Sequence, residues 1–343
     1  MHNLLKGYAV VMSHRDVTRQ RGERPVSATV TVRWIAAEPR VGTLNDIAAA
    51  RAAGEALWVD VLEPDEETLG QLQKLFGLHS LAIEDCLHSR QRPKIDAYPD
   101  NLFIVWIAPR LTPDHAMAGD EIDIFLGSNF LITSHRGPVA ALDAVAGDPC
   151  GALANAAEWA LHAVLDRSVD AMFPVVDMVG DELDRIENEL LAKVQDGQLQ
   201  ELYAAKRMLL ALQKIIGPER DVLRAMARHA DFISQEAYLY FQDVGDHVAR
   251  VADAVDTYRD VASSVMDIYL SAISNRLNVV MKQLTVVATI FMPLTLISGV
   301  YGMNLVNGMW PPTDAAWSFW AVMGSFVVIT SGMLYLFKRR GWW

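Results

Sequence analysis

The sequence is poor in cysteine. Only Cys86 and Cys150 occur among 343 residues, and they are too far apart to form a CxxC pair. Metal or redox motifs built on paired cysteines are therefore excluded, and the low cysteine content fits a reduced, cytosolic setting for the soluble part. We also expect no signal peptide, because residues 1–24 mix charged side chains without an apolar core.

Basic side chains are also scarce. The chain has 30 Lys and Arg against 42 Asp and Glu, a formal net charge of −12. This excess of acid argues against a nucleic-acid partner and is compatible with cations as ligands. No nucleotide-binding loop is present, so we expect no ATP hydrolysis. The acidic residues lie along helical segments without a paired nucleophile and base, so we expect neither an enzyme nor a prosthetic group.

Two long apolar runs lie near the carboxyl terminus, at residues 279–301 and 317–337. Each has about the 20 residues that a membrane-spanning helix needs, although two buried core helices would have a similar composition. The loop at 305–316 has no Lys or Arg, whereas Lys338–Arg340 follow the second run. By the positive-inside tendency, we expect a multi-pass protein of the inner (plasma) membrane with both termini in the cytoplasm.

The first 150 residues predict an α/β cytosolic domain. Alternating or β-branched runs predict strands, and amphipathic runs predict helices between them. The expected strands are 27–35, 57–61, 102–107 and a hairpin of 122–126 with 130–133. One expected helix begins after Asp65, and another spans 80–87. We therefore divide the chain into the domain 1–150, a helical and stalk region 151–278, and two membrane helices in 279–343 with an outer loop at 302–316.

Two prolines bear on the helical region. Pro174 is expected to kink the helical run from Ala152 to Val194 without ending it. The pair Gly217-Pro218 is expected to end a helix that begins at Gln198, with a further helix beginning near Glu219.

One continuous helix from Asp243 to Asn304 organises the chain. Two series with a spacing of seven share one face, because a helix drifts only about 20° per heptad. The members of the two series are Asp243, Arg250, Thr257, Ser264, Ser271, Asn278, Thr285, Met292, Gly299 and Asp246, Asp253, Asp260, Asp267, Ser274, Met281, Ala288, Thr295, Gly302. This face, the polar seam, is polar up to Asn278 and has mostly small or flexible residues beyond it. The opposite side is apolar and able to pack.

A solvated face on the stalk and small packing residues in the membrane would explain the two halves of the polar seam separately. The seam nevertheless continues in phase across the membrane boundary. A water-filled path explains both halves together, so we interpret the helix as lining an ion path.

The end of this helix resembles a known family. Tyr301-Gly302-Met303-Asn304, preceded by Met292-Pro293-Leu294-Thr295 and Ser274–Asn278, looks like the signature of the CorA magnesium transporters. The run from Tyr240 to His247 strengthens the resemblance, which extends over most of the chain apart from the amino-terminal strands.

The resemblance implies a homopentamer, which also satisfies a physical need, because two membrane helices cannot enclose a polar path. It implies a ring of Asn304 side chains that accept hydrogen bonds from the water shell of Mg²⁺. Leu284 and Met292 match the apolar constriction of the family, and Asp267 would form a carboxylate ring. The lining residues implied together are Asp267, Asn278, Leu284, Met292, Thr295, Gly299, Gly302 and Asn304.

The resemblance also implies a regulatory role for Glu84, Asp85 and Asp243, whose family equivalents share divalent cations across a subunit interface. Bound cation would cancel the repulsion between carboxylates and favour a closed pore. Asp166 and Asp170 are secondary candidates. Each of these residues could instead be an ordinary solvated acid.

The expected function is passive, gated uptake of Mg²⁺, with Co²⁺ or Ni²⁺ as further substrates. Two alternatives stay open: a zinc transporter of the ZntB type, which shares the architecture, and a metal sensor or scaffold that does not conduct. The chain also departs from many family members after Asn304, where they have Met-Pro-Glu-Leu and this chain has the run Leu305-Val306-Asn307-Gly308-Met309-Trp310-Pro311-Pro312-Thr313-Asp314. The missing Glu puts cation capture and ion identity in doubt, and Asp314 is a candidate substitute.

Overall fold

The computed structural model describes residues 28–36, 40–88, 91–112, 117–147, 156–303, 311–312 and 317–342. The chain divides into two compact units, residues 1–266 and 267–343. Each unit is described by itself below.

The first unit contains a seven-stranded sheet in its described part, with the order β2-β1-β3-β7-β6-β5-β4. Only β3 and β7 pair in parallel, and the other neighbours are antiparallel. The strands are β1 (Thr29–Trp34), β2 (Val41–Gly42), β3 (Leu57–Leu62), β4 (Lys94–Ala97), β5 (Leu102–Leu111), β6 (Met117–Gly127) and β7 (Phe130–His135). The expected hairpin is confirmed as β6 and β7, with Gly127 paired to Phe130. β4 and the extension of β5 beyond Ile107 were not expected.

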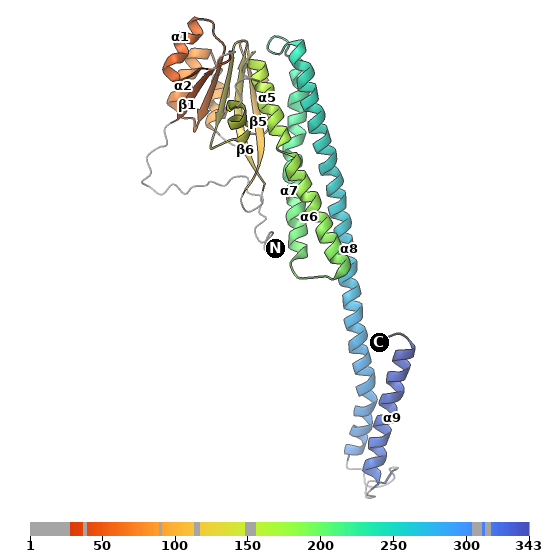
Figure 1. Ribbon diagram of the computed structural model, residues 1–343. Coiled ribbons are helices and arrows are strands. Elements are labelled where there is room, and N and C mark those ends of the chain that lie inside the picture. The colour runs from red at the N-terminus through yellow and green to blue at the C-terminus, as the bar shows by residue number, and fades with distance from the viewer. Residues whose placement is uncertain are drawn as a thin grey trace, which may run out of the picture. The chain divides into compact units, whose positions relative to one another are not determined.

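Short helices cover one face of this sheet (Figure 1). They are η1 (Leu44–Asp46), α1 (Ile47–Ala52), α2 (Glu66–Phe76) and α3 (Ser80–Leu87). The expected cap of α2 is confirmed, since the Asp65 carboxylate accepts a hydrogen bond from the backbone N–H of Thr68. Leu69 and Leu72 of α2 and Cys86 of α3 are buried against the strands. These contacts fix α3, which carries Glu84 and Asp85, on the sheet.

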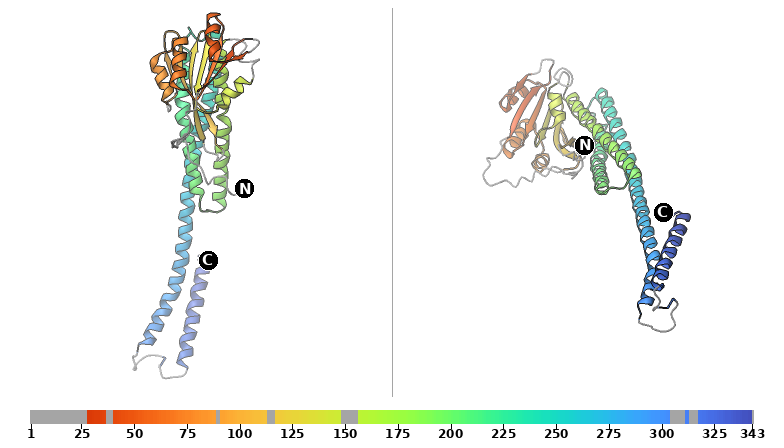
Figure 2. Two further views of the ribbon diagram at one scale, coloured as in Figure 1. Left: turned by 90° about the vertical axis from the view of Figure 1, so that its left-hand side faces the viewer. Right: turned by 60° about the horizontal axis from the view of Figure 1, so that its bottom comes forward.

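Two longer helices, α5 (Ala157–Asp170) and α7 (Gln198–Met226), pack against the other face (Figure 1, Figure 2). The remaining helices of the carboxyl-terminal half of the chain, apart from α9, are α4 (Ala140–Ala146), α6 (Phe173–Ala192) and α8 (Gln235–Gly302). The indole of buried Trp106 in β5 donates to Ser168 Oγ of α5 at 2.9 Å, which joins sheet and helix.

Both expectations about proline were wrong. Pro174 does not lie within a kinked helix, because α5 ends at Asp170 and Pro174 lies in the first turn of α6, where its missing N–H costs nothing. Pro218 does not end its helix, since α7 continues through it to Met226. Ile215 and Val222, on either side of the proline, are both 2% exposed, and this packing keeps the helix together.

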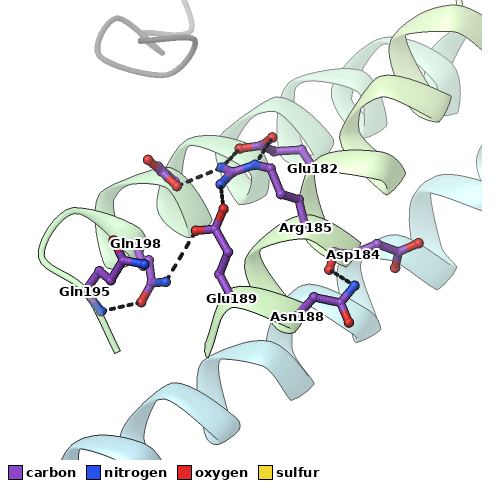
Figure 3. Close-up of polar contacts among 8 residues, drawn as sticks. Glu182, Asp184, Arg185, Asn188, Glu189, Gln195 and Gln198 are labelled. Carbon is purple, nitrogen blue, oxygen red and sulfur yellow. Dashed lines mark hydrogen bonds and ion pairs between the residues drawn. The ribbon is translucent and has the colours of Figure 1, made fainter. Parts of the chain in front are cut away.

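Helices α6 and α7 are joined by a charged cluster around Arg185 (Figure 3). Its guanidinium donates to Glu182 and Glu189 of α6 and, at 2.8 Å, to Glu201 of α7. One cation therefore holds three carboxylates from two helices.

The expected apolar side of α8 packs in the first unit. Val248, Val251, Val255, Ala262 and Val265 are at most 1% exposed. Gly180 of α6 lies so close to the Tyr258 ring of α8 that a Cβ atom there would overlap it. Contacts of this kind orient α8, so that its opposite face is left uncovered.

The second unit holds the carboxyl-terminal part of α8 and α9 (Ser318–Arg339). Both helices are long and apolar enough to cross a membrane, and none of either apolar window is buried inside the chain. The two predicted spans therefore correspond to helices of the right length.

Candidate functional site

The polar seam of α8 is exposed throughout the first unit. The members of the two series that lie in the first unit are all exposed in the single chain, namely Asp243, Asp246, Arg250, Asp253, Thr257, Asp260 and Ser264. The hydroxyls of Thr257 and Ser264 donate to the carbonyl oxygens of Asp253 and Asp260 on the same helix. Their oxygen lone pairs remain free to accept hydrogen bonds from water. Aspartate recurs along this face, and its carboxylates attract cations.

The predicted pore residues of the second unit are exposed as well. The structure describes seven of the eight, and Asn304 lies outside the described residues. Leu284 and Met292 are 68% and 71% exposed, and other large apolar side chains of α8 beside them, such as Phe291 and Leu296, are exposed as well. They require cover from lipid or from other subunits.

Three of the predicted pore residues lie together on one face of α8, at a shallow depression that is open to the outside. Met292, Thr295 and Gly299 line it with neighbouring apolar residues of α8, and its volume is about 510 Å³. The Thr295 hydroxyl donates to the Phe291 carbonyl at 2.8 Å, so its oxygen can still accept. Asn278 lies in a second depression of about 610 Å³, together with Lys282 and Trp342.

Glu84 and Asp85 occupy different surroundings on α3. Glu84 is exposed, whereas Asp85 is partly buried and both of its oxygens are engaged. Lys94 Nζ lies 2.6 Å from Asp85 Oδ2, and Gln91 Nε2 donates to Asp85 Oδ1 at 3.2 Å. Sequence reasoning assigned no role to Lys94. Its only signal was the short basic run of Arg92 and Lys94 at the start of β4. The regulatory candidate Asp85 is thus already paired with a cation of the protein.

Asp243 belongs to a second acidic cluster between α5 and α8. Its carboxylate lies 3.6 Å from His247 Nε2, while His247 Nδ1 lies 3.8 Å from Asp170 Oδ1 and 4.0 Å from Asp166 Oδ1. Ligand atoms of Asp166, Asp170 and His247 all lie within 4.8 Å of one another. His247 Nδ1 is buried and has no hydrogen-bond partner. The oxygen and imidazole donors of this cluster fit a divalent cation.

Electrostatics in the cluster also favour a cation. Burial, and then the neighbouring Asp170 carboxylate, raise the pKa of Asp166 above the usual range for aspartate. A bound cation would offset both effects. His162 lies near Asp166, and burial lowers the pKa of this histidine, whose ring packs edge-on to the rings of Tyr240 and Phe241.

The structure therefore adds His247 to the predicted regulatory residues. It also brings Asp166 and Asp170 together with His247 at one candidate cation site. The signal in the sequence was the spacing of four between Asp166 and Asp170 and between Asp243 and His247. Among the described residues, neither Glu84 nor Asp85 reaches this cluster within one chain.

The chain matches the family model described as CorA-like Mg²⁺ transporter protein over residues 53–339. It is 34% identical over 284 residues to the cobalt/magnesium transport protein CorA of Thermotoga maritima, covering 80% of each chain. It is 33% identical to the putative metal ion transporter YfjQ of Bacillus subtilis, covering 83% of this chain and 89% of the relative. The solved structure of the CorA magnesium transporter of Methanocaldococcus jannaschii superposes with a TM-score of 0.79 at 25% identity, covering 93% of this chain and all of the other.

Proposed function

Because the chain belongs to the CorA-like Mg²⁺ transporter family, we propose that it conducts Mg²⁺ passively through a gated pore. The family assignment makes it a membrane-embedded divalent cation transporter and not an enzyme. The ion, the assembly and the residues that act on the ion are proposals, argued in turn below.

Mg²⁺ is favoured as the substrate by the donors along the polar seam. The seam offers carboxylate, amide and hydroxyl oxygens, and its two series contain no His or Cys. Oxygen donors suit Mg²⁺, which keeps much of its water shell, whereas zinc prefers nitrogen and sulfur. Co²⁺ and Ni²⁺ remain further substrates.

The pore is formed by several copies of α8, and a homopentamer is the assembly that we propose. The observation that carries this proposal is the uncovered polar seam, which runs opposite a packed apolar side. Asp267 attracts the cation, while Asn278, Thr295, Gly299 and Gly302 line its path. Leu284 and Met292 form a constriction that closes by excluding water. A ring of Asn304 side chains at the outer end binds the hydrated ion.

Regulation comes from divalent cations bound on the cytoplasmic side. Glu84 and Asp85 of one subunit and Asp243 of the next share a cation, and Asp166, Asp170 and His247 form a second site nearby. Occupied sites hold the subunits together and the pore closed, since the cation offsets repulsion between carboxylates. In this arrangement the protein lies in the inner membrane, and both of its termini are in the cytoplasm.

The first test is cation uptake into proteoliposomes under an inside-negative potential, with Mg²⁺ and Zn²⁺ measured separately. We expect Mg²⁺ influx that Asn304→Ala reduces at least tenfold. Asn188→Ala is the control, because it removes an exposed amide from α6, outside the proposed pore lining, and should leave influx unchanged. Zinc flux without Mg²⁺ flux would favour a zinc transporter. Assembled protein that passes neither ion would favour a sensor.

A further inference from the structure

Lys94 lies between two carboxylates of the regulatory region. Its ammonium nitrogen is 2.6 Å from Asp85 Oδ2 and 3.2 Å from Asp96 Oδ2. It also lies 5.6 Å from the centroid of the Phe103 ring. Lys94 begins β4, the edge strand of the sheet, so its backbone position is fixed by pairing with Val105 of β5.

The ammonium is charged at neutral pH, because the ordinary pKa of lysine lies well above 7. The side chains of Lys94 and Asp85 are 34% and 27% exposed, so solvent screens their attraction only in part. Asp85 therefore has a permanent cationic partner within its own chain.

A divalent cation that binds Asp85 must share the carboxylate with this ammonium. Two like charges on one carboxylate repel each other, and the divalent cation must weaken or displace the lysine contact. Asp96 offers the displaced ammonium a second acceptor 3.2 Å away, so displacement does not leave it unpaired. Within the described part of the chain, the exposed Glu84 side chain beside it has no ion-pair partner.

We propose that Lys94 competes with the regulatory cation for the Asp85 carboxylate. Without a divalent cation, the Lys94 ammonium pairs with both Asp85 and Asp96. When a divalent cation binds Asp85, the ammonium pairs with Asp96 alone. This inference rests on the regulatory role proposed above for Asp85. It makes Lys94 a positioning residue that sets how much intracellular Mg²⁺ is needed to close the pore.

The experiment is a Mg²⁺ titration of the full-length, assembled protein in detergent after EDTA treatment. Protection from a glutamate-specific protease, whose cleavage sites none of the substitutions below creates or removes, reports the closed state, and calorimetry reports binding. We expect Lys94→Met to lower the Mg²⁺ concentration for half protection about tenfold, which corresponds to about 1.4 kcal/mol. Methionine keeps the length of the stem beside Phe103. Lys74→Met is the matched control, because Lys74 is exposed on α2, and it should not shift the curve.

Asp85→Asn separates the two proposals. If Asp85→Asn raises the Mg²⁺ requirement while Lys94→Met behaves like Lys74→Met, the regulatory role stands and the inference about Lys94 is wrong. If Asp85→Asn has no effect, the regulatory role fails and the inference about Lys94 fails with it. In an Asp85→Asn background we expect Lys94→Met to lose its effect, because the two residues act through one contact.

Discussion

Asp123 shows how a single residue makes stability depend on pH. It lies on β6 opposite Ser134 of β7, is 5% exposed, and its Oδ1 atom has no hydrogen-bond partner. Burial, and then the neighbouring charge of Glu121, raise the pKa of Asp123 to about 7. A hydrogen bond with the Cys86 thiol lowers it only in part. Asp123 is therefore largely protonated in the fold under mildly acidic conditions.

The consequence for stability has a definite sign. In the unfolded chain Asp123 has a pKa of about 3.9, so between about pH 4 and pH 7 the folded state holds a proton that the unfolded state has lost. The contribution of this group to stability is fully present below about pH 4 and is lost as pH rises through about 7. We expect Asp123→Asn to raise the melting temperature relative to wild type more at pH 8 than at pH 5.

Thermal unfolding of the purified protein between pH 5 and pH 9 would check this. Asp100→Asn is the control, because Asp100 is exposed and should leave the profile unchanged. Parallel profiles for Asp123→Asn and wild type would show that Asp123 does not titrate in this range.

At the scale of elements, α8 depends on close packing against α6. Gly180 lets the two helices approach, because its missing side chain leaves room for the Tyr258 ring. Interiors tolerate added volume poorly, since neighbouring side chains must leave their preferred rotamers. The orientation of α8, and with it the direction of the polar seam, is set partly at this contact.

We therefore expect Gly180→Ala to destabilise the protein by about 1–3 kcal/mol, because the new methyl group displaces Tyr258. Gly70→Ala on α2 is the matched substitution, since a Cβ there meets no atom within 4 Å. Alanine should stabilise that helix by up to about 1 kcal/mol. Melting temperatures of the two variants should lie on opposite sides of wild type, and a rise for Gly180→Ala would contradict the packing argument.

At the scale of the whole molecule, the single chain leaves large apolar side chains uncovered. On α8, Leu284, Met292 and Leu296 are each about 70% exposed, and on α9 Trp320 is 74% exposed. Soluble monomers rarely leave so much apolar surface in contact with water. Lipid or further copies of the chain must cover it, and in the proposed assembly Leu284 and Met292 would meet their equivalents around the pore axis.

Widening this constriction should make the closed pore leak. We expect Leu284→Ala and Met292→Ala to leave measurable Mg²⁺ flux at Mg²⁺ concentrations that suppress wild-type flux, because a wider neck stays hydrated. Ile290→Ala removes apolar volume from the side of the same helix that is turned away from Leu284 and Met292, and it should gate normally. If all three variants closed like wild type, the constriction would have to lie elsewhere.

Local patterns made part of this protein readable from its sequence. The hairpin of β6 and β7, the Asp65 cap, the helix α3 and the phase of α8 were all predicted, because each depends on residues a few positions apart. Hydropathy over about 20 residues was enough to locate the two candidate membrane helices. The motif ending at Asn304 indicated the family before any fold was known.

Only the tertiary structure decided which distant residues meet. The parallel pairing of β3 with β7, the contact of Lys94 with Asp85, and the meeting of Asp166 and Asp170 with His247 all join separate elements. Pro218 shows the same limit, since packing around it keeps α7 continuous against its local preference. Periodicity determines which side of an element is apolar, but the partner of that side depends on the packing of the whole chain.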